Sequence, residues 1–283
     1  MGQSRTIRAN VLLISYNHEP FIRQAIRGLL EQQHALELSI IVADDCSTDG
    51  TADIIARQLL DQPYETIFLR REKNLGILKN YEDAFFRTDG AYIFILEGDD
   101  YWVDPLRLQK HVDFLESNPD CVMTMNRFTE YFQESGEQRL PDWPFPGDHI
   151  LITTRQLAEG NRLGNLSACC IRTDTWRKVE QGLFDMPVAD WMIGMALGEH
   201  GSIALLKEPM SVYRKSASGL WSGMHPEQER AYLLELIALY DRFLGFRYYA
   251  EFESHKKRIT ASSSVPKPSG LLTRIRSGLN FFR

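Results

Sequence analysis

Long apolar runs are absent from this sequence of 283 residues. No stretch reaches the roughly 18 consecutive apolar residues that a membrane-spanning helix requires. The first residues also lack the apolar centre of a secretory signal peptide. We therefore expect a protein that does not span a bilayer and that is located in the cytoplasm.

An excess of positive charge is also missing, because the formal net charge is −6 at pH 7. Proteins that bind nucleic acid need cationic side chains to neutralise phosphates, so nucleic acid is not an expected partner. The charge is distributed unevenly, since seven basic residues and no acidic residue follow Glu253.

Cysteines are few, and the four that are present do not have the spacing of a metal site. Two of them, Cys169 and Cys170, are adjacent, and adjacent cysteines rarely bridge each other. A reducing compartment is the simplest interpretation. We also find no internal repeat.

Four short apolar runs alternate with amphipathic segments in the first 100 residues. The predicted strands cover residues 11–14, 39–43, 65–69 and 91–96, and the predicted helices cover 20–33, 51–60 and 78–86. This alternation is typical of a parallel sheet covered by helices on both faces. The expected fold class is therefore α/β.

Polar and charged side chains follow each of these predicted strands. They are Ser15 and Asn17, then Asp44 and Asp45, then Arg71, and finally Asp99 and Asp100. Ligands of open α/β sheets bind outside the carboxyl ends of the strands, so this pattern predicts a site there. The alternative to a ligand site is a purely structural explanation. Loops are generally polar, and the adjacent acids Asp99 and Asp100 can simply form a turn and cap a helix. Asp104, before Pro105, is better placed to cap the next helix.

The second half of the chain is less regular. We expect a helix after Asp104, a strand over 121–132, a long loop over 133–149, and paired strands over 202–206 and 211–214. Trp143 and Phe145 in the long loop either stack on a ligand or hold the loop in place. A long helix is expected from Pro226 to about Phe252, followed by a linker over 262–266. We divide the chain into a main domain (1–225), a helical extension (226–260) and a basic tail (261–283).

Four segments, in order, resemble motifs of family 2 glycosyltransferases, the inverting nucleotide-sugar enzymes with the GT-A fold. They are residues 12–17 (LLISYN), 42–51 (VADDCSTDGT), 74–76 (NLG) and 96–100 (LEGDD). The resemblance implies a Rossmann-like, mostly parallel sheet flanked by helices. It also implies sugar transfer from a nucleoside diphosphate to an acceptor hydroxyl, in the synthesis of a cell-surface polysaccharide or glycan.

The resemblance also implies roles for individual residues. Asp100 is the expected direct ligand of Mn²⁺ or Mg²⁺, with Asp99 as a second ligand or a ribose contact, and Asp45 is expected to accept the imide N–H of a uracil ring. The other expected donor contacts are Ser15, Tyr16, Asn17, Asp44, Arg71, Asn74, Gly76, Lys79 and Arg214. Because Arg70 is adjacent to Arg71, the sequence does not decide which of the two arginines contacts the donor.

Acceptor activation requires a base on the side opposite the leaving group. Asp190, in a segment similar to the family's acceptor motif, fits this role, although an ordinary helix cap explains the same residue. The chain departs from the family pattern at Ala189, where the family often has Glu, and at Ser216, where a His often follows the Tyr213–Arg214 pair. His225 is a candidate substitute for that His.

The expected partners are a nucleoside diphosphate sugar, with uridine preferred, and a saccharide or lipid-linked acceptor. Residues 265–283 have helical apolar spacing with arginines between, which is compatible with peripheral contact at the inner face of the membrane or with a disordered end. A non-catalytic binding or scaffold protein is the main alternative. A sugar nucleotidyltransferase is less favoured, because residues 15–18 lack the glycine-rich basic loop that holds a triphosphate.

Overall fold

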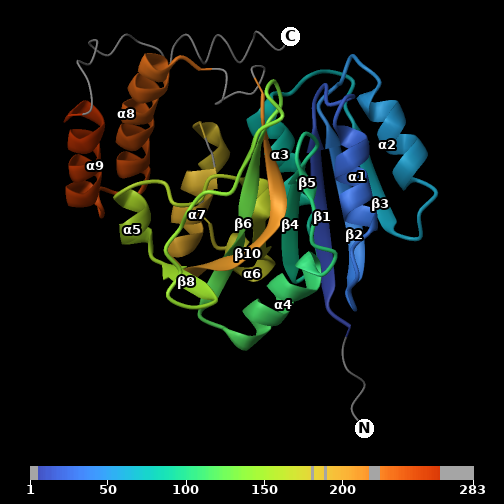
Figure 1. The fold of residues 1–283 in the computed structure, drawn as a ribbon, viewed down its shortest axis with the longest axis horizontal. Helices are drawn as coiled ribbons and strands as arrows, with labels where there is room; N and C mark the ends of the chain where they lie inside the picture. Colours follow the sequence, from blue (N-terminus) through green and yellow to red (C-terminus); the bar gives the residue numbers. More distant parts are fainter. Residues whose placement is uncertain (1–5, 180–181, 188–189, 217–223, 262–283) are drawn as a thin grey trace.

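The computed structural model describes residues 6–179, 182–187, 190–216 and 224–261. One mixed sheet forms its centre (Figure 1). Hydrogen bonds between its strands give the order β3-β2-β1-β4-β9-β6-β10-β5. Four parallel strands make up its first half: β1 (Arg8–Ser15), β2 (Glu37–Asp44), β3 (Glu65–Arg70) and β4 (Tyr92–Glu97). The parallel α/β architecture predicted from the apolar runs is confirmed.

The second half of the sheet contains both strand directions. Its strands are β5 (Tyr101–Trp102), β6 (Cys121–Phe132), β7 (Gln138–Arg139), β8 (His149–Ile152), β9 (Cys169–Arg172) and β10 (Ser202–Lys215). Strand β9 runs antiparallel to both β4 and β6 and so joins the two halves. Strands β6 and β10 are parallel, and β5, β7 and β8 pair with them in antiparallel fashion.

Helices cover both faces of the sheet because its strands bury side chains on both sides. On one face, Val11 and Leu13 pack with α1 (Ile22–Leu30), α2 (Thr51–Leu59) and α4 (Arg107–Ser117). On the other, Leu12 and Ile14 belong to a core with α3, α5, α6, α7, α8 and α9. These span Ile77–Phe86, Thr154–Ala158, Thr173–Trp176, Asp190–Gly198, Pro226–Phe243 and Tyr249–Ala261, and two 3₁₀ turns span Leu166–Ala168 and Leu183–Asp185.

Two predicted elements of the second half are wrong. Residues 202–206 and 211–214 do not pair with each other, because they belong to the single strand β10. Pro209 lacks an amide hydrogen and shifts the register with β6, but the strand continues past it. The long predicted helix is divided into α8 and α9, because Gly245 and Phe246 have φ angles of 62° and 59°, which end α8.

The cap expected from Asp104 lies just before the helix. Its Oδ1 accepts the Leu106 amide at 2.8 Å, but α4 begins at Arg107, with Leu106 in the cap position. In the long loop, Trp143 and Phe145 are partly buried against the main core, and Trp143 meets Phe128 edge to face at 6.0 Å. These contacts support the interpretation that they hold the loop in place.

The predicted division of the chain remains a prediction. Buried side chains of α8 and α9, including Tyr240 and Phe252, share the core of α7. The linker over 262–266, the tail and residues 217–223 of the loop before α8 lie outside the described residues. No helix in the described ranges has both the length and the apolar character needed to cross a membrane.

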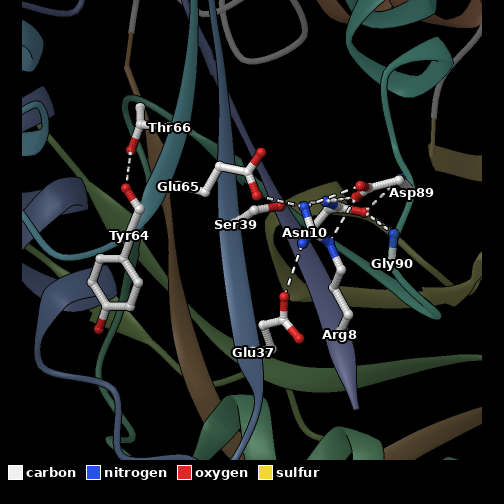
Figure 2. Close-up of polar contacts among 9 residues, drawn as sticks. All are labelled: Arg8, Asn10, Glu37, Ser39, Tyr64, Glu65, Thr66, Asp89 and Gly90. Carbon is white, nitrogen blue, oxygen red and sulfur yellow. Dashed lines mark hydrogen bonds and ion pairs between the residues drawn. The ribbon is translucent and has the colours of Figure 1, made fainter. Parts of the chain in front are cut away.

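A polar network joins the amino ends of the strands (Figure 2). Arg8 forms ion pairs with Glu37 at 2.9 Å, Glu65 at 2.6 Å and Asp89 at 3.0 Å. Buried Asn10 donates to Ser39 at 2.6 Å, and its Oδ1 accepts the backbone amides of Asp89 and Gly90 at 3.0 and 2.7 Å. The network fixes the amino ends of β1, β2, β3 and β4. The carboxyl ends of the same strands, at the opposite end of the sheet, are therefore the place to look for a ligand site.

Candidate active site

The carboxyl ends of the neighbouring parallel strands β2, β1 and β4 lie together at one end of the sheet, which we call the carboxyl edge. Strand β1 lies between β2 and β4, and the register pairs Ser15 with Asp44 and Ile14 with Glu97. The loops after these strands therefore leave the sheet together. Asp45 and Asp100, which follow β2 and β4, lie at the same edge of the sheet.

Asp44 ties the loop after β1 to the loop after β2. It is buried, its Oδ1 accepts the hydroxyls of Ser15 at 2.9 Å and Ser47 at 2.6 Å, and its Oδ2 accepts the Ser47 amide at 3.0 Å. Asn17, with a φ of 54°, accepts the Thr48 amide at 2.8 Å. Ser15, Asn17 and Asp44 thus shape the two loops, and half-buried Tyr16 lies between the first two.

Asp45 faces the loop between β3 and α3. Its two oxygens accept the amides of Leu75 at 2.6 Å and Gly76 at 2.9 Å. Asn74 reinforces this contact, because it donates to the Asp45 carbonyl at 3.2 Å and accepts the Gly76 amide at 3.0 Å. Burial raises the pKa of Asp45 despite these donors. Asp45 is 3% exposed, and each of its oxygens accepts one hydrogen bond from the protein, whereas a carboxylate oxygen can accept two.

The structure separates the two adjacent arginines. Arg71 lies close enough to Asp45 for its charge to oppose the rise in the pKa of that carboxyl, and it pairs with Asp83 at 2.6 Å. Arg70 instead pairs with Asp53 on α2 at 2.9 Å. Lys79 lies on the surface of α3, where it pairs with Glu82 at 2.6 Å and approaches Asp185 at 3.7 Å.

Residues 97–100, which we call the acidic turn, contain three carboxylates with different surroundings. Asp100 is only 1% exposed, and its oxygens accept hydrogen bonds from Asn165 at 2.8 Å, the Ser167 hydroxyl at 2.7 Å and the Arg214 amide at 2.9 Å. Burial and the charges of Asp99 and Glu97 raise the pKa of Asp100 well above its usual range. The side chain of Asp99 is 32% exposed. Asp99 is thus the more accessible of the adjacent pair.

Arg214 supports the acidic turn from β10. Its Nε donates to the Asp99 carbonyl at 2.8 Å, and its other guanidinium nitrogens donate to Gln133 at 2.6 Å and Gln24 at 2.8 Å. The guanidinium also lies over the ring of Phe21, 4.6 Å from its centroid. With 8% of its surface exposed, Arg214 positions the turn rather than extending into solvent.

Glu97 is a site residue that the sequence reasoning did not identify. It accepts a hydrogen bond from the Tyr81 hydroxyl at 2.7 Å, and its amide donates to Ser167 at 3.0 Å. Burial and the Asp99 charge raise the pKa of Glu97 to about 7. The sequence feature that could have identified Glu97 as a site residue is its spacing from Asp99, since the two acids are separated by a single glycine.

Asp190 is the first residue of α7. Its Oδ2 accepts a hydrogen bond from Asn161 at 3.2 Å, the Trp191 and Gly164 amides also donate to it, and burial raises its pKa. The charge of Asp190 is also among the causes that raise the pKa of Glu97. Asp190 therefore lies in the first turn of α7, where it accepts backbone amides, and within electrostatic reach of the acidic turn.

Tyr213 lies among all of these acids. Burial and the charges of Asp100, Glu97, Asp190 and Asp99 raise its pKa far above its usual value. The acidic turn and the start of α7 thus share one electrostatic environment. The candidate substitute His225 is used elsewhere, because its Nδ1 accepts the Glu227 amide at 3.5 Å and caps α8.

Comparison with known proteins shows the family of the chain. The family described as Glycosyl transferase family 2 matches residues 10–174, which include the acidic turn and the Asp45 loop. The chain belongs to glycosyltransferase family 2. A putative teichuronic acid biosynthesis glycosyltransferase, TuaG of Bacillus subtilis, is 31% identical over 222 residues, which is 75% of this chain and 82% of that protein. An uncharacterized Mycobacterium tuberculosis protein is 29% identical over 78% of this chain, and the match spans 62% of that relative's length.

Solved structures of other glycosyltransferases have the same fold. S. aureus TarS (residues 1–349) in complex with UDP-GlcNAc aligns with a TM-score of 0.65 at 17% identity, over 91% of this chain and 74% of that one. The mannosyltransferase PcManGT from Pyrobaculum calidifontis, in complex with GDP-Man and Mn²⁺, aligns with a TM-score of 0.59 at 13% identity, over 97% and 81% of the two chains. The GT-A fold expected from the motifs is confirmed.

The residues of the acidic turn fit a divalent cation that is bound together with a substrate. Within the described residues, no three His, Cys, Asp or Glu side chains gather as a complete metal site. Mg²⁺ and similar ions are commonly held by one or two protein carboxylates, with phosphate oxygens and water completing the shell. Asp99 offers such a carboxylate, because its side chain is 32% exposed and its Oδ1 lies 3.9 Å from His18 Nε2, beyond hydrogen-bond distance.

Proposed function

We propose that this chain is an inverting glycosyltransferase that transfers a sugar from a nucleoside diphosphate, with uridine preferred, to an acceptor hydroxyl during synthesis of a cell-surface glycan. The observation that carries the proposal is the acidic turn, where an accessible Asp99 stands on a backbone fixed by Asp100 and Arg214. The UDP-GlcNAc and GDP-Man complexes of the structural relatives support the donor class. The name of the Bacillus subtilis relative supports the glycan.

The nucleoside end of the donor is assigned to the Asp45 loop. The Asp45 carboxylate is held by two amides and keeps acceptor capacity, which suits the imide N–H of uracil. Arg71 lies beside it and limits the cost of keeping this buried group ionised. Ser15, Tyr16, Asn17, Asp44, Asn74 and Gly76 shape the surrounding loops.

The diphosphate end is assigned to Asp99. Mn²⁺ or Mg²⁺ bound there supplies positive charge that stabilises the leaving diphosphate. Burial favours Asp99 over Asp100 as the direct ligand, because the Asp99 side chain is 32% exposed, whereas Asp100 is 1% exposed and accepts three hydrogen bonds from the protein. Asp100 and Arg214 are then positioning residues for Asp99, and Lys79 on the surface of α3 is assigned as an outer contact of the donor.

Acceptor activation is assigned to Asp190. A carboxylate whose pKa is raised by burial is a better proton acceptor than an ordinary exposed Asp. Its hydrogen bond from Asn161 and its place at the start of α7 fix its orientation. A saccharide or lipid-linked acceptor, a cytoplasmic location and membrane contact through residues 265–283 stay predictions.

The test is sugar transfer or hydrolysis with a panel of UDP-sugars and Mn²⁺, measured as UDP release. We expect turnover by the intact chain and about a hundredfold loss or more in Asp99→Asn, because one interaction with developing charge is worth this much in other enzymes. Asp61→Asn, which changes an exposed carboxylate between the end of α2 and the start of β3, is the matched control. Binding of UDP-sugar without turnover under any metal would instead support the non-catalytic alternative.

A further inference from the structure

His18 lies in the loop after β1, on the α1 side of the acidic turn. Its ring occupies the space beside Gly98, where a Cβ would come within 2.7 Å of the His18 Nδ1 and 2.9 Å of the Ile22 Cδ1. The absence of a side chain at Gly98 therefore makes room for the imidazole. The two residues are far apart in sequence but fit together at the turn.

The two nitrogens of His18 have different surroundings. Nδ1 is buried and has no hydrogen-bond partner. Nε2 is 3.9 Å from Oδ1 of Asp99, which is too long for a hydrogen bond. The side chains of His18 and Asp99 are 22% and 32% exposed, so a small ligand can reach both.

Packing alone does not explain an imidazole at this position. An apolar side chain of similar size would fill the space beside Gly98 and Ile22 without burying an unpartnered nitrogen, which costs about 1 to 3 kcal/mol. An imidazole has an advantage over an apolar side chain here only if Nε2 binds a ligand. The gap between Nε2 and the Asp99 carboxylate is where such a partner fits.

We propose that His18 Nε2 and the Asp99 carboxylate are together the protein ligands of the divalent cation. This inference rests on the proposed function, since the nucleotide diphosphate and water complete the shell. A nitrogen ligand on a site otherwise made of oxygens favours a transition metal such as Mn²⁺ over the harder Mg²⁺. The site therefore selects Mn²⁺ through His18.

The test is pulsed electron paramagnetic resonance of Mn²⁺ bound to the intact chain with UDP, which detects a directly bound nitrogen. We expect nitrogen coupling in the wild type and none in His18→Phe, which keeps the ring and removes its nitrogens. The Kd of Mn²⁺ in the presence of UDP should rise about tenfold or more in His18→Phe. The melting temperature without metal checks that this variant is folded.

Two further variants sharpen the result. His18→Gln places an amide oxygen near the position of Nε2, so we expect partial recovery of binding and a smaller preference for Mn²⁺ over Mg²⁺. His200→Ala removes an exposed imidazole at the end of α7 and should leave both the coupling and the Kd unchanged.

The failure of this inference is distinguishable from failure of the proposed function. If the wild type binds UDP with Mn²⁺ and turns over donor but shows no nitrogen coupling, or if His18→Phe keeps it, His18 is not a ligand and the transferase assignment stands. If the wild type binds no Mn²⁺ in the presence of UDP, both the His18 site and the metal-dependent mechanism are overturned.

Discussion

The backbone amide of Arg214 donates a 2.9 Å hydrogen bond to Oδ1 of Asp100, although 114 residues separate the two. The same arginine holds the Asp99 carbonyl through its Nε at 2.8 Å. Strand β10, in the second half of the sheet, thus fixes the backbone of a turn that follows β4, in the first half. This relationship assigns Asp99 and Asp100 different roles, and the predictions below depend on it.

Asp100→Asn and Asp99→Asn should fail in different ways. In Asp100→Asn, one buried acceptor becomes an NH₂ group facing donors, so we expect the free energy of unfolding to fall by about 2 kcal/mol. In Asp99→Asn, the partly exposed side chain has fewer contacts, so stability should change by less than about 0.5 kcal/mol. Urea denaturation of both variants is the measurement. Equal destabilisation of the two would contradict the division of roles.

Asp45→Asn should weaken nucleotide binding more than it slows turnover. The substitution removes the negative charge and one of the two oxygens that accept the Leu75 and Gly76 amides. Because a charged hydrogen bond is worth about 1.5 to 3 kcal/mol, we expect KM for the donor to rise at least about tenfold, with a smaller change in kcat. Steady-state kinetics at varied donor concentration separates the two effects. A loss confined to kcat would count against the nucleoside assignment of this loop.

Glu97 should make the protein less stable as the pH rises. The folded state raises the pKa of Glu97 from 4.5 to about 7. Between these values the folded protein keeps a proton that the unfolded chain has released, so the free energy of unfolding falls with rising pH across this window. In Glu97→Gln this contribution is absent, and the fall between pH 5 and 8 should be smaller. Denaturation at several pH values tests this, with Glu72→Gln, which changes an exposed carboxylate, as control. If the free energy of unfolding has the same slope against pH in the wild type and in Glu97→Gln, the prediction is refuted.

Asn10→Ala should reduce stability without affecting the chemistry. The Asn10 side chain is buried and bonds to Ser39, Asp89 and Gly90 at the amino ends of the strands (Figure 2). Its loss leaves two backbone amides without acceptors, so we expect a cost of about 2 kcal/mol. The KM for donor should stay within about twofold of the wild-type value, because the network lies at the edge opposite the site. A large KM change with normal stability would argue against this separation.

Much of the first half of the fold was predictable from the sequence. Buried parallel strands are apolar throughout, so β1, β2 and β4 stand out as short runs, and the amphipathic helices between them follow. The placement of Asp45 and Asp100 at one edge also followed, because parallel strands present their carboxyl ends together. The second half was less predictable, since Pro209 within β10 gives the same signal as a break between two strands.

The detailed site depended on contacts that local sequence does not contain. Which of two adjacent acids faces solvent is decided by Asn165 and Ser167, which lie 65 and 67 residues after Asp100 and bury it. The fit of His18 beside Gly98 is likewise a tertiary contact. Gly245 is the local sequence feature that marks the end of α8. Apolar residues with a helical period on both sides of it led us to predict one continuous helix.

The most direct test of the central claim is calorimetric titration of UDP into the chain, with and without Mn²⁺, for the wild type and Asp99→Asn. We predict that Mn²⁺ strengthens UDP binding at least about tenfold in the wild type and has little effect in Asp99→Asn, because Asp99 links the cation to the diphosphate. UDP affinity that is independent of Mn²⁺ in the wild type, or equally dependent on Mn²⁺ in Asp99→Asn, would contradict the account.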